Sequence, residues 1–428
     1  MQDWKSYEPL LLPSIKHLNE IDVYEQTGGY SALKKILGSP VDWTPEKVVS
    51  EVKNANIRGR GGAGFNAGLK WSFMPKPDGQ PRYLACNGDE SEPGTFKDRK
   101  IFEYNPHAFI EGAIIAAYAM HIDAIYVYIR GEYRPFVKML DKAIAQAYDR
   151  GYLGKGIQGS GFGVEMYTHM GAGAYICGEE SSLMESLEGK RGYPRVKPPF
   201  PAQRGLWGRP TTINNIETLA NVPLVINKGA SWYRSIGAEN HPGPVLYGIS
   251  GHVNRPGVYE YPAGMPVMTL INEVAGGVRG GKKIKALIPG GSSTPPLRGE
   301  HLEGLTMDAD GLREAGSMMG TAGMVVLDED TDMVEVIWRI SHFYHHESCG
   351  QCTPCREGTG WLEKTLIKIR DGRGEMRDLD LLLTICNRME GRTICALADA
   401  AAWPVRYSID RFRDEFEKRC KKTVYATA

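Results

Sequence analysis

Three cysteines near the C-terminus restrict this chain more than any other feature. Cys349, Cys352 and Cys355 are separated by two residues each, and Pro354 precedes the third thiol. Three thiolates in one tight loop can bind three irons of a cubane, and a fourth ligand must come from elsewhere. Structural zinc sites usually use Cys-x-x-Cys pairs that a longer loop separates. The run therefore favours a [4Fe–4S] cluster and electron transfer, with zinc as the alternative.

The fourth ligand has to come from the remaining cysteines. Cys395 follows the Gly391-Arg392 turn and precedes an alanine-rich helical run, Ala396–Trp403. We predict Cys395 to be the ligand, because Cys420 lies among basic residues near the C-terminus. The other thiols stand in apolar or glycine-rich surroundings, where a thiol usually packs as a small hydrophobic group: Cys86, Cys177 and Cys386.

Composition argues against several classes of function. The 428 residues carry no net charge, so no strong field attracts a nucleic acid. The most apolar helical segment, Ala108–Met120, is shorter than a bilayer is thick and contains Glu111, which predicts no membrane span. Residues 1–13 lack the charged start and long apolar core of a signal peptide. We expect a cytosolic chain of two to four domains.

The loop Arg58–Phe65 is unusually rich in glycine and contains a Gly-x-Gly-x-x-Gly pattern. It follows a predicted helix, Pro45–Asn56, whereas the dinucleotide fingerprint follows a strand, so the pattern alone is weak. Exposed backbone N–H groups and two arginines suit a phosphate or a flat ring that approaches the backbone. A flexible surface loop is the alternative.

Strands and helices alternate after this loop. Such β-α-β-α-β order predicts a parallel sheet with right-handed crossovers. Ligands of such sheets bind beyond the carboxyl ends of the strands, where the chain reads Asn87–Gly94, Gly131-Glu132 and Gly171–Tyr175. One binding crevice is therefore expected. The predicted elements are strands Arg82–Asn87, Ala124–Arg130 and Val164–His169, and helices Pro106–His121 and Arg134–Arg150.

Several charged and polar residues are candidates for this crevice. Glu179 and Glu180 open a helix, so they either cap it or join Asp89 and Glu92 in binding ribose hydroxyls and heterocycles. Lys197 lies in a stiff proline-rich segment that ends near Phe200. We expect Asn214-Asn215 to begin a helix, with paired amides that can bind a phosphate or a ring edge.

The second half of the chain changes character twice. Residues 241–330 have the β-β-α-β-β order of a small mixed sheet, after a first domain of residues 1–240. Residues 331–428 are predicted to form a helical bundle around the cysteines, with separate helices at Ala396–Trp403 and Ile409–Lys418. His342 and His346 share a helix face, and we expect packing or a partner contact there rather than a metal.

Together these motifs resemble the NADH-binding flavoprotein subunit of bacterial respiratory complex I. The resemblance implies an α/β Rossmann-like flavin domain, a ubiquitin-like β-grasp domain and a C-terminal helical bundle with one [4Fe–4S] cluster. Two departures stand out: Asn66-Ala67 replaces the usual Pro-Thr, and Gly88 replaces Ala. The resemblance rests on Arg58–Phe65, Asn87–Arg99, Gly171–Ser181, Glu188–Pro201, Asn214–Thr218 and Cys349–Gly358 with Cys395.

The resemblance also implies which residues bind FMN and NADH. Phe65, Phe73 and Phe200 would stack on the adenine, and Glu92, Glu180 and Lys197 would bind the ribose and the nicotinamide. Glu92, Glu179 and Glu180 are the candidate catalytic residues, in the sense that they orient the reacting groups. FMN would be held by Gly59, Arg60, Gly61, Gly62, Ala63, Gly64, Lys70, Asn87, Asp89, Tyr175, Gly178, Glu179, Asn214, Asn215 and Thr218, with Gly171 at the same crevice.

The resemblance further implies partners and a location. A thioredoxin-like [2Fe–2S] subunit and a larger iron–sulfur subunit would hold the chain at the cytoplasmic face of the inner membrane, with no membrane contact of its own. A similar subunit serves as the diaphorase of NAD-reducing hydrogenases and NAD-dependent formate dehydrogenases, and this is the nearest alternative. A zinc-stabilised interaction module is the alternative without catalysis.

Overall fold

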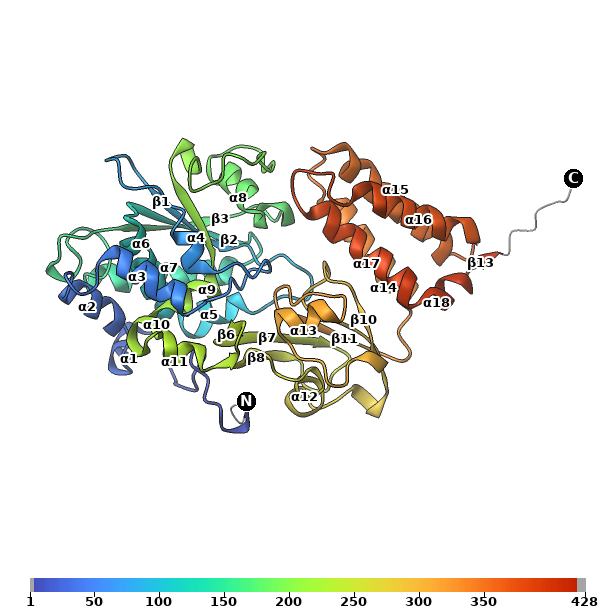
Figure 1. Cartoon of the computed structure of the whole chain (residues 1–428), viewed down its shortest axis with the longest axis horizontal. Coiled ribbons are helices and arrows are strands. Elements are labelled where there is room, and N and C mark those ends of the chain that lie inside the picture. Colours follow the sequence, from blue (N-terminus) through green and yellow to red (C-terminus); the bar gives the residue numbers. More distant parts are fainter. Residues whose placement is uncertain (1–3, 422–428) are drawn as a thin grey trace, which may run out of the picture.

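The computed structural model describes residues 4–421. The outermost parts of the first and last predicted domains, residues 1–3 and 422–428, lie outside the described residues. A part with a four-stranded parallel sheet, a part with a five-stranded sheet and a bundle of helices follow one another along the chain (Figure 1). The helical bundle lies at the end of the molecule away from the N-terminal helices. In this view the second sheet lies below the first sheet, between the N-terminal helices and the bundle.

The first sheet has four parallel strands in the order β3-β2-β1-β4. The predicted alternation is confirmed for its first three strands. Strand residues alternate between the two faces: Leu84 and Cys86 pack with the α6 side, whereas Ala85 packs with Ile213 on the other. Bounds are β1 Tyr83–Gly88, α5 Asp98–Tyr104, α6 Pro106–Met120, β2 Ala124–Ile129, α7 Arg134–Asp149, β3 Glu165–Met170, α8 Glu180–Leu187 and β4 Thr211–Asn215.

The fourth strand is a correction to the sequence analysis. Asn214 and Asn215 end β4, which pairs with β1, and only Asn215 caps the helix that follows. The run Thr211–Asn215 has one apolar residue, so it shows no apolar alternation. Its three β-branched residues, Thr211, Thr212 and Ile213, do favour a strand, and this was the available signal.

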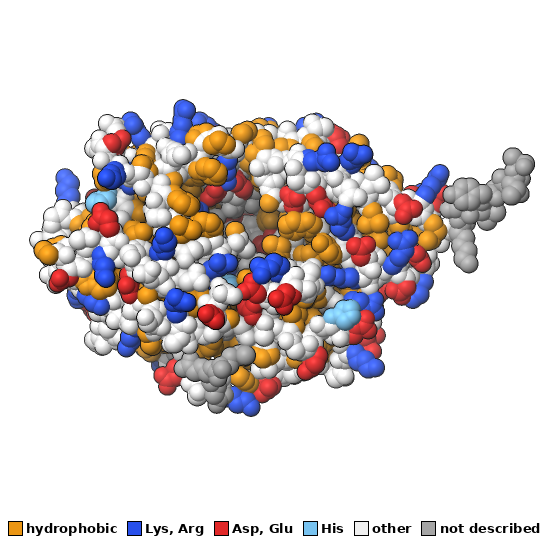
Figure 2. Space-filling model, viewed as in Figure 1, with side chains coloured by type: hydrophobic (Ala, Val, Ile, Leu, Met, Phe, Trp, Pro, Cys, Tyr) orange, Lys and Arg blue, Asp and Glu red, His pale blue; other side chains and the backbone are white. Residues whose placement is uncertain are grey.

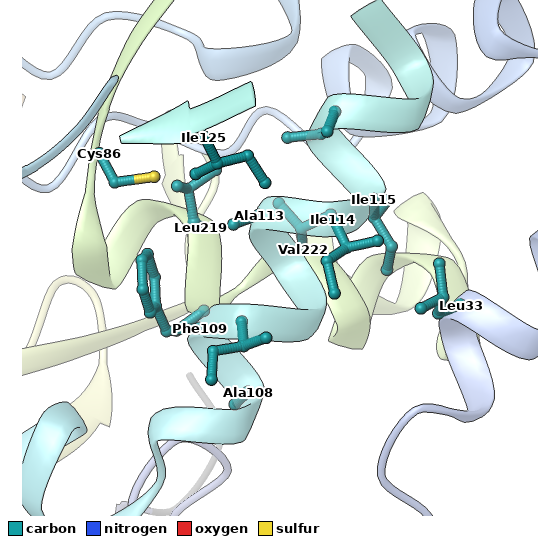
Figure 3. Packing of buried hydrophobic residues seen from close by; sticks show 14 of the residues in the cluster. Leu33, Cys86, Ala108, Phe109, Ala113, Ile114, Ile115, Ile125, Leu219 and Val222 are labelled. Atoms are coloured by element: carbon teal, nitrogen blue, oxygen red, sulfur yellow. The ribbon is translucent and has the colours of Figure 1, made fainter. Parts of the chain in front are cut away.

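Helix α6 forms the centre of the largest core. All its residues except Tyr118 are buried, so it is apolar on every side, as expected of a helix enclosed by others. Figure 3 shows Phe109, Ile114 and Ile115 of α6 among side chains of other elements. Other elements that contribute residues to this core are α1 Ile21–Gln26, α2 Ser31–Gly38, α3 Pro45–Asn54, α4 Ala67–Trp71, α9 Ile216–Ala220, α10 Val222–Lys228 and α11 Ala230–Arg234.

The second sheet is mixed, as predicted, with the order β10-β9-β11-β7-β8. Strands β7 and β11 pair in parallel, and the other pairs are antiparallel. A short strand and helix α13 were not expected from the sequence. Bounds are β7 Pro244–Gly251, β8 Gly257–Pro262, α12 Val267–Thr269 continued by a π-helical turn Leu270–Val274, β9 Ile284–Ile288, β10 Leu297–Arg298, α13 Ala309–Glu314 and β11 Gly323–Asp328.

The C-terminal bundle contains α17 as one continuous helix, whereas two were predicted. Pro404 lies inside it and removes one backbone hydrogen bond. Buried residues on both sides of the proline, including Ala401 and Val405, outweigh that loss by packing. Bounds are α14 Met333–Glu347, α15 Thr353–Arg370, α16 Met376–Met389, α17 Leu397–Arg411 and α18 Arg413–Glu417, with short pairs β5 Gly237–Ala238 with β6 His241–Pro242, and β12 Gly374–Glu375 with β13 Cys420–Lys421.

Within residues 4–421, the structure contains no helix that combines the length and the hydropathy needed to cross a bilayer.

Close approach of two helices generates the first prediction. A methyl group on Gly112 of α6 would come within 1.9 Å of the backbone oxygen of Leu219 in α9. Alanine normally stabilises a helix by about 1 kcal/mol relative to glycine. We expect Gly112→Ala instead to destabilise the protein by about 2–4 kcal/mol, because backbone atoms must move.

Thermal unfolding would measure this effect. Gly38→Ala is the matched control, since Gly38 is also helical and nothing lies within 4 Å of its added methyl. It should be neutral or stabilising. Equal behaviour of the two variants would contradict the packing of α6 on α9.

Candidate functional site

A cavity of about 440 Å³ lies at the carboxyl ends of β1 and β4. Its walls come from all three parts of the chain: Gly61 and Asn87 from the first, Gly320 from the second and Cys395 from the third. The molecule is visibly hollowed near the middle of the face that Figure 2 shows. This position agrees with the predicted crevice and with the rule for open α/β sheets.

The glycine-rich loop forms one wall through its backbone. The N–H of Gly59 donates to the oxygen of Phe65 at 2.8 Å, which closes the loop. Gly62 and Gly64 have φ values of 116° and 64°, a conformation that favours glycine. Gly61 lies so close to Asn215 that an added methyl would come within 3.2 Å of the Asn215 Cβ. The bare backbone can therefore approach a ligand closely, as the sequence predicted.

Arg60 has a different role from the one that its positive charge suggested. Its guanidinium donates to the backbone oxygens of Pro242 and Pro244 at 2.9 and 3.0 Å, and it contacts His241. The backbone N–H of Arg60 donates to the Thr218 hydroxyl at 2.9 Å. Arg60 therefore ties the glycine loop to the start of the second sheet.

Buried charges lie beneath this loop. The Lys97 ammonium is 2.6 Å from the Glu217 carboxylate and 2.8 Å from that of Asp98. Burial lowers the pKa of Lys97, but the neighbouring carboxylates outweigh it and raise the pKa above its usual value. The lysine stays charged and lines the cavity. A buried ion pair is stable only when the two charged groups meet at a favourable distance and angle and both are otherwise hydrogen-bonded.

Two carboxylates at the end of β1 also line the cavity, Asp89 and Glu92. Burial raises the pKa of Asp89 to about 7, although the Ser91 hydroxyl and Arg130 act in the opposite direction. Glu92 accepts hydrogen bonds from Tyr175 and from the backbone of Ser293. Asn87 donates to the backbone oxygen of Gly178 at 2.8 Å, which holds the two strand-end loops together.

Glu179 has both of the roles that the sequence left open. It caps α8, because its side chain accepts from the N–H groups of Ser181 and Ser182 at 2.8 and 3.0 Å, and it also lines the cavity, 3.2 Å from the Lys197 ammonium. Glu180 lies 3.0 Å from the Lys70 ammonium and 2.6 Å from that of Lys197. Although burial opposes it, these two cations lower the pKa of Glu180 to about 2. It is a charged hydrogen-bond acceptor at neutral pH.

The three predicted stacking phenylalanines are all exposed. Phe65, Phe73 and Phe200 expose 46%, 56% and 55% of their surface. The rings of Phe65 and Phe73 lie 6.0 Å apart and tilted. Exposed aromatic faces in this region are available to a flat heterocycle.

The cysteines meet where the helical bundle faces the cavity. Cys352 caps α15, Cys355 lies in its first turn and Cys349 precedes both. The N–H of Ile394 donates to the Cys352 sulfur at 3.4 Å, which brings the Cys395 loop against the first three thiols. Burial raises the pKa of Cys395 to about 12, and Cys349 and Cys355 lie close enough to add to it.

The geometry fits the chemistry predicted for these thiols. Each ligand of a cubane binds its own iron, so the sulfurs need not converge on one point. Among the described residues, no group of three or more His, Cys, Asp or Glu side chains is arranged to hold a single metal ion. His342 and His345 instead contact Glu363. The predicted packing of the other thiols is confirmed for Cys86, Cys177 and Cys386, which are buried.

The structure sorts the predicted ligands into two sets. Those that line the cavity are Arg60, Gly61, Gly62, Ala63, Asn87, Asp89, Glu92, Tyr175, Gly178, Glu179, Asn215 and Cys395. Those outside its lining are Gly59, Gly64, Phe65, Lys70, Phe73, Gly171, Glu180, Lys197, Phe200, Asn214, Thr218, Cys349, Cys352 and Cys355.

Sequence reasoning missed other lining residues. Lys97 and Asp98 lie inside one of the matching motifs, but nothing local marks them as buried. Ser293 and Thr321 lie in loops between strands of the second sheet, and their approach depends on domain packing. The Gly-Pro loop Pro289–Pro296 was the available signal, because such loops often lie near ligands. Ala400 and Trp403 complete the wall from α17.

The departures from the family pattern have local explanations. Asn66 caps α4 by accepting from the Leu69 N–H at 2.8 Å. A methyl group on Gly88 would lie 2.9 Å from the Tyr128 backbone oxygen, so the close strand spacing here is suited to glycine.

The buried pair beneath the cavity generates the second prediction. Glu217→Gln should destabilise the protein by about 3 kcal/mol, because it leaves the buried Lys97 short of one counter-charge. Glu103→Gln is the control: its pair with Lys100 has a similar distance, 2.8 Å, but is about one-third exposed. That change should cost less than about 0.5 kcal/mol. Chemical denaturation of both variants would test this, and similar losses would contradict it.

Comparison with known proteins agrees with this geometry. Residues 52–224 match a family described as Nuo51 FMN-binding domain, 246–336 an SLBB domain, and 335–419 the NADH-ubiquinone oxidoreductase-F iron-sulfur binding region. The predicted FMN domain and [4Fe–4S] region are confirmed. The last match decides between cluster and zinc in favour of the cluster.

Whole-chain relatives and a solved structure are also similar. The F 2 subunit of NADH-quinone oxidoreductase in Rhizobium meliloti is 52% identical over 97% of this chain and 99% of its own. The F subunit in Rickettsia bellii is 50% identical over 92% and 94%. The crystal structure of an air-oxidized NAD+-reducing [NiFe]-hydrogenase is 35% identical, with a TM-score of 0.81 over 92% of this chain and 66% of that one. The chain belongs to the family of NADH-quinone oxidoreductase F subunits.

Proposed function

We propose that this chain oxidises NADH as a subunit of complex I, using FMN and one [4Fe–4S] cluster. The observation that carries the proposal is the shared cavity. Its lining includes the glycine loop and the strand ends, and also Cys395 and the first turns of α17. Ligands held by these two sets of residues are therefore neighbours.

The cavity suits a flavin nucleotide on several grounds. Its volume lies in the usual range for ligand sites, and bare glycine backbone allows close approach. Amides and carboxylates supply hydrogen-bonding groups for a ring and a ribityl chain. We assign FMN to Gly59, Arg60, Gly61, Gly62, Ala63, Gly64, Lys70, Asn87, Asp89, Gly171, Tyr175, Gly178, Glu179, Asn214, Asn215 and Thr218.

Arg60, Lys70, Asn214 and Thr218 act indirectly in this assignment. The Asn214 side chain accepts from the Trp71 indole at 3.0 Å, and the Thr218 hydroxyl accepts from Arg60. The Lys70 ammonium binds Glu180. These contacts hold the loops that carry the other FMN ligands, so the four side chains orient the site.

NADH is assigned to the outer part of the site. The exposed rings of Phe65, Phe73 and Phe200 stack on its adenine, and the charged set Glu92, Glu180 and Lys197 binds its ribose and nicotinamide. Bound FMN would supply the chemistry that joins a donor of hydride to a cluster that accepts single electrons. The side chains Glu92, Glu179 and Glu180 position the reactants, and hydride transfer requires no acid or base from the protein.

Finer structural assignments belong to the same proposal. We assign residues 1–240 to the Rossmann-like FMN and NADH domain, 241–330 to a ubiquitin-like β-grasp domain and 331–428 to the cluster domain. The partners are a thioredoxin-like [2Fe–2S] subunit and a larger iron–sulfur subunit. Through them the chain is placed at the cytoplasmic face of the inner membrane.

A second candidate is the diaphorase subunit of an NAD-reducing hydrogenase or formate dehydrogenase. The similarity to the hydrogenase structure favours it. The higher identity and nearly complete mutual coverage of the Rhizobium relative favour complex I. Purification from native membranes separates the two, because only complex I would bring quinone reductase subunits with the chain.

The cluster ligands generate the third prediction. Cys395→Ser should abolish the cluster's electron paramagnetic resonance signal and reduce iron and acid-labile sulfide, because serine is a poor substitute for a thiolate ligand. FMN content and the bleaching of flavin absorbance by NADH should remain. Cys420→Ser is the control, since Cys420 is a half-exposed thiol at β13, and it should keep the cluster.

Two results would count against this assignment. Full iron and sulfide in the Cys395→Ser protein would remove Cys395 from the ligand set. Wild-type protein that contains no flavin and does not reduce ferricyanide with NADH would remove the proposed activity.

A further inference from the structure

The Glu92 carboxylate already has protein partners on both oxygens. The Tyr175 hydroxyl donates to Oε2 at 2.7 Å, and the Ser293 backbone N–H donates to Oε1 at 2.7 Å. All three residues line the cavity. The orientation of this carboxylate is therefore set by two loops that belong to different parts of the chain.

A buried tyrosine on α14 lies behind this carboxylate. The Tyr344 hydroxyl is 2.9 Å from the Ser292 hydroxyl and 3.4 Å from Glu92 Oε1. Its ring packs edge-on against that of Tyr175, with centroids 5.8 Å apart. Tyr344 is fully buried and does not line the cavity, so it can act on a ligand only through its neighbours.

The Tyr344 hydroxyl remains a donor at physiological pH. Burial, together with the charge of Glu92, raises its pKa well above the ordinary value. A protonated hydroxyl can donate to only one acceptor at a time. The short contact with Ser292 therefore forms a chain of hydroxyls that leads from α14 to the loop holding Glu92.

The Pro289–Pro296 loop packs closely against the Glu92 side chain. A methyl group on Gly291 would come within 2.5 Å of the Glu92 side chain. The Ser292 N–H donates to the oxygen of Pro93, next to Glu92, at 3.0 Å. The loop and the carboxylate must therefore move together, and the Tyr344 hydroxyl ties both to the helix that leads into the cysteine loop.

We propose that Tyr344 is a positioning residue for the nucleotide: through Ser292 it fixes Glu92 and the Pro289–Pro296 loop in the orientation that binds NADH. This inference rests on the proposed function, in which Glu92 binds the nicotinamide end. A purely structural role would instead place the importance of Tyr344 in its ring, which fills space in the core.

Removal of the hydroxyl alone separates these roles. In the intact complex, Tyr344→Phe should raise the KM for NADH about three- to tenfold, with kcat changed less than about twofold. FMN content and the cluster signal should not change. Tyr24→Phe is the matched control, because the Tyr24 hydroxyl also is buried and donates to a glutamate, Glu111, at 2.6 Å. It should leave the KM unaltered.

A double-mutant cycle tests the route through Glu92. If Tyr344 acts through Glu92, the KM of Glu92→Gln/Tyr344→Phe should equal that of Glu92→Gln. An unchanged KM in Tyr344→Phe, or effects of the two changes that multiply independently, would overturn the inference. Wild-type complex that fails to oxidise NADH would instead overturn the proposed function, before any variant is compared.

Discussion

The site depends most on the ion pairs and the hydrogen bond of one fully buried carboxylate, that of Glu217. It pairs with Lys97 from the loop after β1 and accepts from the Leu246 N–H at 3.0 Å in the second sheet. Arg60 lies 3.9 Å away and carries the glycine loop with it. An unpaired charge in this position would cost several kcal/mol. Alternative placements of these loops are therefore unfavourable, and the pairing favours the arrangement in which the cavity is open.

The site is assembled from distant parts of the chain. Gly61, Glu92 and Cys395 are far apart in sequence, yet all three border one cavity. NADH donates two electrons together and the cluster accepts one at a time, so the nucleotide site and the cluster site must be adjacent. The second sheet makes this adjacency possible, since its loops reach both the strand ends and α14.

Local patterns in the sequence predicted much of this arrangement. Apolar strands alternating with helices predicted three parallel strands and the crevice at their ends, and the thiol spacing predicted the cluster loop. Strand β4 was missed because its buried threonines have no apolar pattern. The continuity of α17 through Pro404 depends on tertiary packing that no local rule contains. The site residues divide in the same way: glycines and carboxylates at strand ends follow from topology, whereas the burial of Lys97 and the place of Ser293 in the cavity wall depend on contacts across the sequence.

The central claim is that FMN is required between NADH and the cluster. Its most direct test uses protein that retains the cluster but has lost FMN. The account predicts that anaerobic NADH leaves the cluster oxidised in such protein, and that added FMN restores its reduced paramagnetic signal. Reduction of the cluster by NADH at an undiminished rate without flavin would contradict the account.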